Sequence, residues 1–217
     1  MSHEIHENDR QEGLTQAWHG LTHIFPVISL LTCWLAKWDV KARDLFRPTE
    51  PNGDPDAPAF VPSGHQELVC TDNEGIVVSK EPINPATYHV LSNKSFLAIV
   101  ADAMASIPGA IVTSVGSLCN RARIFVTLAV PDVGAFMAAG REFKPYLNFL
   151  SSHDKSAEFT VVASTVCTVC NNTFSANLAT TEGDTLRISI KHRPGMAQRL
   201  ANVSGIIAAY YATVEHF

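Results

Sequence analysis

Two adjoining apolar runs constrain the fold of this chain most strongly. Residues 110–118 and 123–130 are rich in β-branched side chains, and only the four residues Cys119-Asn120-Arg121-Ala122 separate them. Apolar runs of this length joined by so short a connection are typical of a β-hairpin. We therefore expect an antiparallel sheet that is built around this hairpin.

Segments with helical or strand patterns flank the hairpin on both sides. Ser92 is a suitable N-cap for a helix over about 93–106, where apolar residues recur at helical spacing until Pro108-Gly109 ends it. The later patterns predict a short helix over 133–139, strands over 144–151 and 185–192, a strand or the approach to a helix over 159–166, a helix around 172–178 and a long helix over 196–214. This order predicts an α+β fold, in which helices pack on an antiparallel sheet with a β-hairpin.

The first part of the chain differs from this regular pattern. Residues 1–16 are polar, and we expect residues 17–217 to form a single α+β domain. Residues 47–64 hold five prolines and two glycines, which interrupt helices and central strands, so this stretch is predicted to be a loop. Two short strands over 67–70 and 75–79 are expected to follow it.

The net charge restricts how this chain could bind nucleic acid. The 217 residues carry a formal net charge of −5, and the sequence pI is about 6.0. A protein that binds nucleic acid over its whole surface is normally basic. Any contact with nucleic acid must therefore come from a local cluster of Lys and Arg residues, with the acidic residues placed elsewhere.

The N-terminus and the cysteines bear on the compartment. The first residues contain no apolar signal segment, and the apolar stretch over 25–35 is too short and too interrupted to span a bilayer. Five cysteines without the spacing of a disulfide framework favour a reducing compartment. We expect a cytoplasmic protein that makes no membrane contact.

Two local patterns are candidates for chemistry. Cys167-x-x-Cys170 has the spacing of a zinc or redox pair, but no second such pair and no βαβ context accompanies it, so packed small residues are the preferred interpretation. His153-Asp154 resembles a general base with an orienting carboxylate, yet Ser152 and Lys155 beside it indicate a turn. We therefore predict no catalytic residue, no metal and no cofactor.

Basic residues recur at the predicted ends of the strands. If these ends meet at one edge of the sheet, they form a cationic stripe that suits a phosphate backbone. The candidate contacts are Arg121, Arg123, Arg141, Lys144, Lys155, Lys191, His192 and Arg193, with His153 and Asn172 as polar partners. The alternative is that these residues are charged only because loop ends are solvated.

Short motifs recur along the chain in an order that resembles a known family. They are Trp18-His19-Gly20-Leu21, residues 70–77, Tyr88 to Asn93, Gly116-Ser117-Leu118 with the hairpin after it, Leu150 to Ser156, Cys170-Asn171-Asn172-Thr173 and Ile190 to Arg193. Together they span about residues 17–195 and resemble the phage- and plasmid-borne family called domain of unknown function 932. Three positions depart from that pattern: Cys70 and Cys167 stand where the family tends to have Arg, and Lys155 stands where it has Gly.

The resemblance implies a mobile-element protein, and we add a hypothesis about its fold. The order of helix, β-hairpin, further strands and long helix is similar to the Rad52-like single-strand annealing fold, which forms rings or filaments that hold single-stranded DNA by its backbone. This similarity implies a homo-oligomer that binds single-stranded DNA and anneals strands in phage or plasmid recombination, without a cofactor. Two alternatives stay open: a small phage-encoded enzyme using His153, Asp154 and Cys170, and a non-enzymatic protein that contacts host proteins through residues 47–64 and the tryptophan segment.

Overall fold

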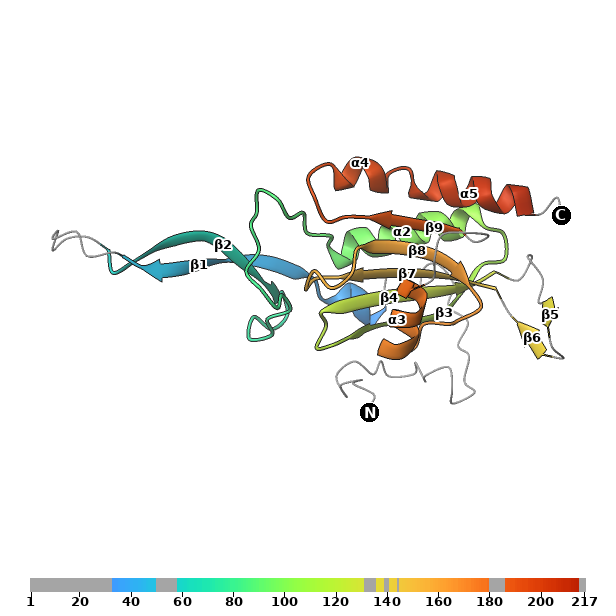
Figure 1. Ribbon diagram of the computed structural model, residues 1–217, viewed down its shortest axis with the longest axis horizontal. Coiled ribbons are helices and arrows are strands. Elements are labelled where there is room, and N and C mark those ends of the chain that lie inside the picture. The colour runs from blue at the N-terminus through green and yellow to red at the C-terminus, as the bar shows by residue number, and fades with distance from the viewer. Residues whose placement is uncertain are drawn as a thin grey trace.

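A five-stranded antiparallel sheet lies at the centre of the fold (Figure 1). The computed structural model describes residues 33–49, 58–130, 136–138, 141–143, 145–179 and 186–214, with the backbone alone at 136–138 and 141–143. The strands follow the order β3-β4-β7-β8-β9, and every neighbouring pair is antiparallel. Their bounds are Ile111–Leu118 (β3), Arg123–Ala129 (β4), Tyr146–Ser152 (β7), Phe159–Ser164 (β8) and Arg187–Ile190 (β9).

The predicted hairpin is confirmed as β3 and β4. Its connection contains three consecutive residues with left-handed backbone angles, Cys119, Asn120 and Arg121, at φ 55°, 53° and 68°. This reversal lets Leu118 pair with Arg123, and the pairing continues from there along both strands. It is interrupted only by a one-residue irregularity between Val112 and Ser114.

Helices cover both faces of the sheet, which explains why its strands are apolar on both sides. On one face lie α2 (Asn93–Ser106), α4 (Met196–Leu200) and α5 (Val203–Val214), and α3 (Asn171–Ala179) lies on the other (Figure 1). Phe96 of α2 meets Phe159 of β8 edge to face, with ring centroids 6.1 Å apart. On the other face, Phe174 of α3 packs with a smaller hydrophobic cluster, which consists of Leu118, Phe125, Leu150, Ala157 and Val162. The α+β prediction is confirmed.

Local sequence signals predict the start of α2 correctly but miss the break between α4 and α5. The Ser92 hydroxyl accepts the N–H of Ser95 at 3.0 Å, so the predicted N-cap of α2 is confirmed. The predicted single helix over 196–214 is wrong, because a turn at 201–202 separates α4 from α5. Asn202 lies at this break and its carbonyl accepts the N–H of Ile206 in the first turn of α5. Asn favours helix starts over helix interiors, which is the physical reason for the break.

The predicted helix over 133–139 is wrong where the structure describes it. Phe136–Ala138 forms strand β5, which pairs with β6 (Arg141–Phe143) as a separate two-stranded ribbon. Residues 133–135 and 139 of the prediction lie outside the described residues. A helix of so few residues is unstable on its own, whereas pairing satisfies the backbone groups of a short strand.

A long two-stranded arm extends from the body of the protein (Figure 1). After the short 3-10 helix η3 (Trp34–Lys37), β1 (Val40–Pro48) pairs with β2 (Phe60–Cys70). The loop predicted over 47–64 is therefore wrong at both of its ends, which are strand. Its middle, residues 50–57, lies outside the described residues. Pro48 and Pro62 are tolerated there because a two-stranded ribbon has an unpaired edge on each strand, where proline removes no ladder hydrogen bond.

The second strand expected after residue 70 is present only as an isolated pairing. Val77 bridges Val69, and the N–H of Val78 donates to the carbonyl of Leu68 at 2.9 Å. The N–H of Leu68 donates in turn to the Ser79 hydroxyl at 2.9 Å. These contacts hold residues 77–79 against the base of β2.

A buried polar cluster fixes the segment between β8 and α3. The Asn148 side-chain oxygen accepts from the Thr127 hydroxyl at 2.8 Å and from the Thr168 hydroxyl at 2.9 Å. The Asn177 amide of α3 donates to Thr168 Oγ1 at 2.8 Å, and its oxygen accepts from Ser164 at 2.7 Å. Because each buried polar group has a partner, the cluster joins the sheet to α3 without an unpaired donor or acceptor among these side chains.

Candidate functional site

Arg121 is buried inside the fold and does not contribute to the predicted cationic stripe. Only 8% of the residue is exposed, and its guanidinium Nη1 donates to both carboxylate oxygens of Asp72 at 2.7 and 2.9 Å. The same guanidinium lies 5.0 Å from the centre of the Trp38 ring. This arginine therefore joins the hairpin turn to the segment after β2, and we leave it out of the candidate site.

Arg123 is held by neutral groups on the α3 side of the sheet. Its Nε donates to the Ser156 hydroxyl at 2.9 Å, and Nη1 donates to the Asn171 side-chain oxygen. The guanidinium carbon also lies 5.5 Å from the centre of the Phe174 ring. Asn172, the next residue of α3, is exposed and does not line the cleft described below. The side chain of Arg141 and all of Lys144 lie outside the described residues.

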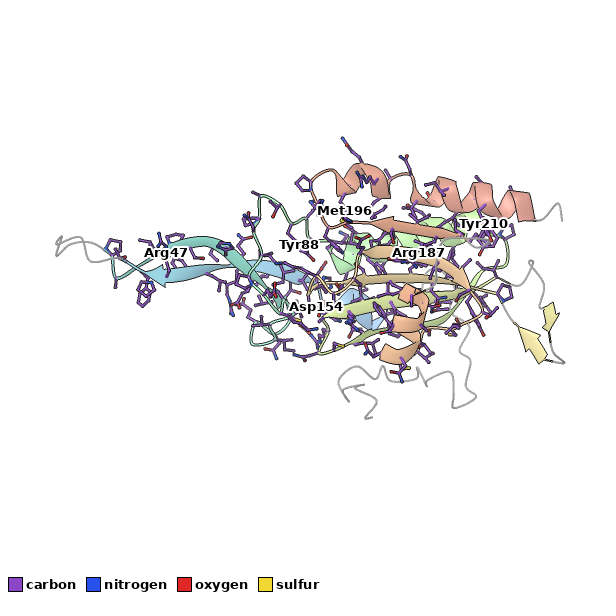
Figure 2. The ribbon with its side chains drawn as sticks, viewed as in Figure 1. Arg47, Tyr88, Asp154, Arg187, Met196 and Tyr210 are labelled. Carbon is purple, nitrogen blue, oxygen red and sulfur yellow. The ribbon has the colours of Figure 1, made fainter. Side chains whose placement is uncertain are left out.

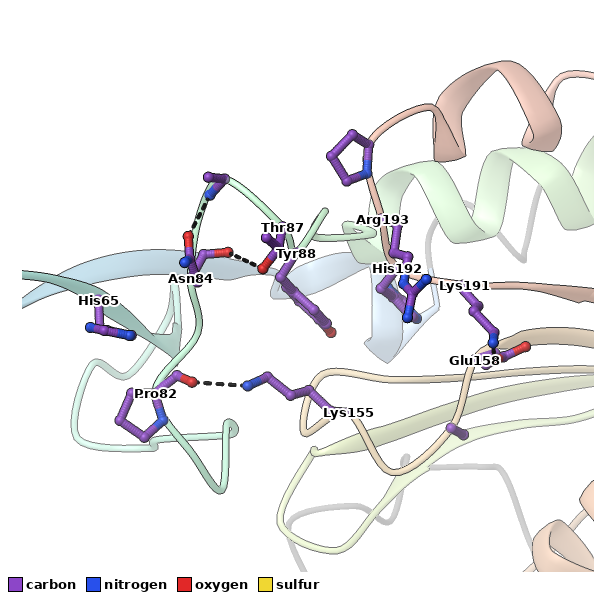
Figure 3. A pocket seen from close by; sticks show the side chains of 13 residues that line it. His65, Pro82, Asn84, Thr87, Tyr88, Lys155, Glu158, Lys191, His192 and Arg193 are labelled. Atoms are coloured by element: carbon purple, nitrogen blue, oxygen red, sulfur yellow. Dashed lines mark hydrogen bonds and ion pairs between the residues drawn. The ribbon is translucent and has the colours of Figure 1, made fainter.

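Three of the predicted cations meet at one cleft, which is the candidate site. The cleft has a volume of 710 Å³ and lies between the base of the arm and one end of the sheet (Figure 3). Lys155 follows β7, and Lys191 and Arg193 follow β9. A tight turn, in which the N–H of Arg193 donates to the Lys191 carbonyl at 2.8 Å, keeps the last two cations together. All three side chains belong to exposed residues.

The contacts of the three cations leave an excess of positive charge in the cleft. Lys155 donates to the carbonyl of Pro82 at 2.9 Å, across the cleft from its own turn (Figure 3). Lys191 lies 3.8 Å from Glu158, a long ion pair between two solvated side chains. One carboxylate therefore faces three cations among the residues that line the cleft. A partly neutralised cluster of this kind attracts an anion such as phosphate.

Lys155 holds its position at a cost in backbone strain. Its φ angle is 62°, in the left-handed region where glycine is favoured. The turn is fixed around it, because the Asp154 carboxylate accepts the N–H of Ser156 at 3.0 Å and the Ser152 hydroxyl donates to the Ala157 carbonyl at 2.9 Å. The left-handed angle gives a physical reason for the glycine that the resemblance expects at this position.

A stacked pair of rings forms the wall of the cleft between the cations. Tyr88 and His192 lie face to face, with centroids 5.3 Å apart and 10° between the ring planes. His192 Nδ1 lies 3.2 Å from the His89 carbonyl, and Nε2 lies 3.3 Å from the Ser151 hydroxyl. Burial lowers the pKa of His192 to about 4, and burial raises that of the Tyr88 phenol. At neutral pH this wall is therefore aromatic and uncharged.

The opposite wall comes from the arm and the segment after it. His65 of β2, Pro82, Asn84 and Thr87 line this side (Figure 3). Figure 2 shows Tyr88 and Asp154 at this junction, whereas Arg47 lies far along the arm. No sequence pattern indicates His65 or Asn84, because they come from segments far from the basic residues. Tyr88 lies within a motif of the resemblance, which implies no role in binding for it.

His153 and Asp154 form separate structural contacts. The His153 ring is 1% exposed, with Nε2 3.0 Å from the side-chain oxygen of Asn93, and burial together with the nearby His192 lowers its pKa to about 3. Burial raises the pKa of Asp154, but Lys80, 2.8 Å from the carboxylate, and Ser156 outweigh it, so that the net pKa is lowered. Neither residue lines the cleft.

The two cysteines of the CxxC pattern contact hydroxyl groups. Cys167 Sγ lies 3.6 Å from the Ser114 hydroxyl and 3.8 Å from the Thr113 hydroxyl, and burial raises the pKa of its thiol. Cys170 is buried, and its sulfur lies 3.5 Å from the hydroxyl of Thr173. These surroundings agree with the interpretation of both cysteines as packed residues next to α3.

Comparison with known proteins assigns the chain to a family. No curated protein and no solved structure matches it. In the described residues, none of the helices is long and apolar enough to cross a bilayer. A family model described as "Domain of unknown function (DUF932)" matches residues 83–217, which include α2, the whole five-stranded sheet and the cations of the cleft but not the arm. The expected resemblance is confirmed over more than half of the sequence, and the chain belongs to the DUF932 family.

Proposed function

We propose that this protein binds single-stranded DNA along the cleft and anneals complementary strands during phage or plasmid recombination. The observation that carries the proposal is the convergence of Lys155, Lys191 and Arg193 on one cleft of a protein with a net charge of −5. An acidic protein attracts DNA only where its cations are concentrated. Tyr88, half-buried and stacked on the buried His192, adds an aromatic ring of the kind on which bases stack.

The geometry suits recognition of the backbone better than recognition of the bases. Lysine and arginine side chains supply sequence-independent contacts to phosphates, and an annealing protein must hold a strand while its bases remain able to pair. The helix, the hairpin and the further antiparallel strands support our hypothesis of a relation to the Rad52-like annealing fold. Annealing of this kind uses a self-assembled protein, so we include homo-oligomerisation in the proposal.

The test is binding of a single-stranded oligonucleotide by two variants of equal net charge. The first replaces Lys155, Lys191 and Arg193 with Gln, and the second replaces Lys37, Lys94 and Arg199, which are exposed outside the cleft. We expect the cleft variant to lose at least about tenfold in affinity at low salt, because three phosphate contacts are removed. The control variant should bind like the original protein. Equal binding by both variants would overturn the proposal.

A further inference from the structure

Arg123 carries a positive charge that no carboxylate neutralises within the described part of the chain. This residue begins β4, and its Nε donates to the Ser156 hydroxyl at 2.9 Å while Nη1 donates to the Asn171 side-chain oxygen. Both acceptors are neutral. Arg121, two positions earlier, instead donates to the carboxylate of Asp72. Hydrogen bonds to neutral groups orient a guanidinium without cancelling its charge, so Arg123 can attract an anion.

The guanidinium of Arg123 is held in one orientation. Its carbon lies 5.5 Å from the centre of the Phe174 ring of α3. Ser156 is fixed as well, because its N–H donates to the Asp154 carboxylate at 3.0 Å and Lys80 pairs with that carboxylate at 2.8 Å. Of the five N–H donors of a guanidinium, hydrogen bonds to described residues use two. Arg123 is only half-buried, so a ligand from solvent can reach the remaining donors, which are already oriented to bind a pair of oxygen atoms.

The turn between β7 and β8 connects Arg123 to the cleft. Lys155 and Ser156 are consecutive residues of this turn, and the first lines the cleft whereas the second binds Arg123 on the α3 side of the sheet. Arg123 also pairs with Ser152, the last residue of β7, so it lies at the same end of the sheet as the turn. The cleft and Arg123 are therefore neighbouring cationic sites, on either side of one turn.

We propose that Arg123 is a second phosphate site, and that a single strand held in the cleft continues past Ser156 around the end of the sheet to reach it. The ligand is a phosphate of the DNA backbone, because two parallel N–H groups of a guanidinium match two phosphate oxygens. Such a contact reads no base, in keeping with a protein that leaves the bases free to pair. This inference rests on the proposed function, since it extends the path of the same strand beyond the cleft.

Two substitutions change the charge of this site in opposite directions. Arg123→Gln removes a cation, and Asn172→Lys adds one at an exposed position of α3, next to the Asn171 that binds Arg123. Arg199→Gln and Ala105→Lys are the matched controls, because both positions are exposed and lie on helices of the opposite face of the sheet (Figure 1). Arg123→Lys keeps the charge. Asn172→Lys alters only an exposed side chain, so it tests the site even if Arg123→Gln lowers the stability, which circular dichroism checks.

Fluorescence anisotropy with single-stranded thymidine oligonucleotides of about 4 and about 16 nucleotides tests the proposal. On the long oligonucleotide, Arg123→Gln should bind about threefold more weakly at low salt and lower the slope of log K against log salt by about 0.7, and Asn172→Lys should raise that slope by a similar amount. The short oligonucleotide, which the cleft alone can hold, should bind both variants like the original protein. Arg123→Lys should keep the slope, because the slope follows the charge, whereas a purely structural role for Arg123 would change stability and leave the slope of every variant alike. Both controls should match the original protein.

The cleft variant, which lacks the three cations of the cleft, separates this inference from the proposed function. A slope that falls in the cleft variant but not in Arg123→Gln overturns the second site and leaves the cleft intact. A slope that falls in Arg123→Gln but not in the cleft variant overturns the cleft, and with it the path, while Arg123 remains a phosphate contact. Equal losses by Arg123→Gln on the two oligonucleotides, or an Asn172→Lys variant that binds no better than Ala105→Lys, would also overturn the path.

Discussion

Tyr88 and His192 stack face to face with their ring centroids 5.3 Å apart, although 104 positions separate them in the sequence. Tyr88 belongs to the segment before α2, and His192 follows the last strand of the sheet. The stack therefore ties the segment before α2 to the end of β9 within one wall of the cleft. It also places an uncharged aromatic surface beside Lys191 and Arg193.

Removing the tyrosine ring should weaken both the fold and the site. We expect Tyr88→Ala to lower the free energy of unfolding by about 2 kcal/mol, since a half-buried ring and its stacking partner are lost. Tyr88→Phe keeps the stack and gives up only a 3.4 Å hydrogen bond to the Ser152 carbonyl, so it should cost less than about 1 kcal/mol. Urea denaturation measures both. Equal losses in the two variants would contradict a role for the stack.

Acid should destabilise this fold well before its carboxylates titrate. Burial holds the pKa of His153 at about 3 and that of His192 at about 4, whereas an unfolded histidine titrates near about 6.5. Between these values the unfolded chain binds more protons, so stability is full above about pH 6.5 and is lost as the pH falls toward 4. Each pKa unit corresponds to about 1.4 kcal/mol, so the loss amounts to several kcal/mol.

Urea midpoints between pH 7.5 and pH 4.5 check this dependence. His192→Gln should flatten the decrease, because one of the two buried imidazoles is removed. His65→Gln, at an exposed position of the arm, is the matched control and should leave the decrease unchanged. A stability that is constant from pH 7.5 to pH 4.5 would be inconsistent with two buried neutral histidines.

Lys155 offers a test that separates strain from function. Lys155→Gly relieves a left-handed backbone angle of 62° and should leave the protein as stable as before or raise its stability by up to about 1 kcal/mol. The same change removes a cation from the cleft, so single-stranded DNA binding should weaken. Thermal unfolding and fluorescence anisotropy measure the two effects. If stability falls and DNA binding is unchanged, Lys155 serves the fold and not the site.

Arg121 should behave in the opposite way. Arg121→Ala breaks a bidentate contact with Asp72 and the contact with the Trp38 ring, so we expect a loss of about 2–3 kcal/mol in unfolding free energy. Arg121→Lys should restore only part of it, because an ammonium can pair with Asp72 but lacks the planar guanidinium that lies against the Trp38 ring. The salt dependence of DNA binding should not change. A variant with normal stability but a smaller salt dependence of DNA binding would show that Arg121 contacts DNA.

The sequence allowed the fold to be predicted wherever local signals are strong. The β3–β4 hairpin followed from two β-branched runs and a short connection, and α2 followed from Ser92 and its apolar spacing. The arm is not predicted because its prolines indicate a loop, and only the pairing of β1 with β2 shows that a strand can hold them. The break between α4 and α5 depends on one asparagine within a long apolar pattern.

The candidate site was predictable only in part. Lys155, Lys191 and Arg193 could be named because they follow predicted strands whose ends meet. Arg121 follows the same rule, but its side chain turns inward to an aspartate 49 positions away. Sequence position gives the place of a residue along the chain, whereas the direction of its side chain depends on partners that only the folded chain brings close. The same holds for His65 and Asn84, which the fold brings to the cleft.

The salt dependence of single-stranded DNA binding tests the central claim most directly. Between about 50 and 200 mM salt, the slope of log K against log salt reports the number of phosphates contacted, at about 0.7 per contact on a single strand. We predict that neutralising Lys155, Lys191 and Arg193 lowers this slope by about 2, while neutralising Lys37, Lys94 and Arg199 leaves it unchanged. An original protein that retains no DNA at 50 mM salt, or two variants with the same slope, would contradict the account.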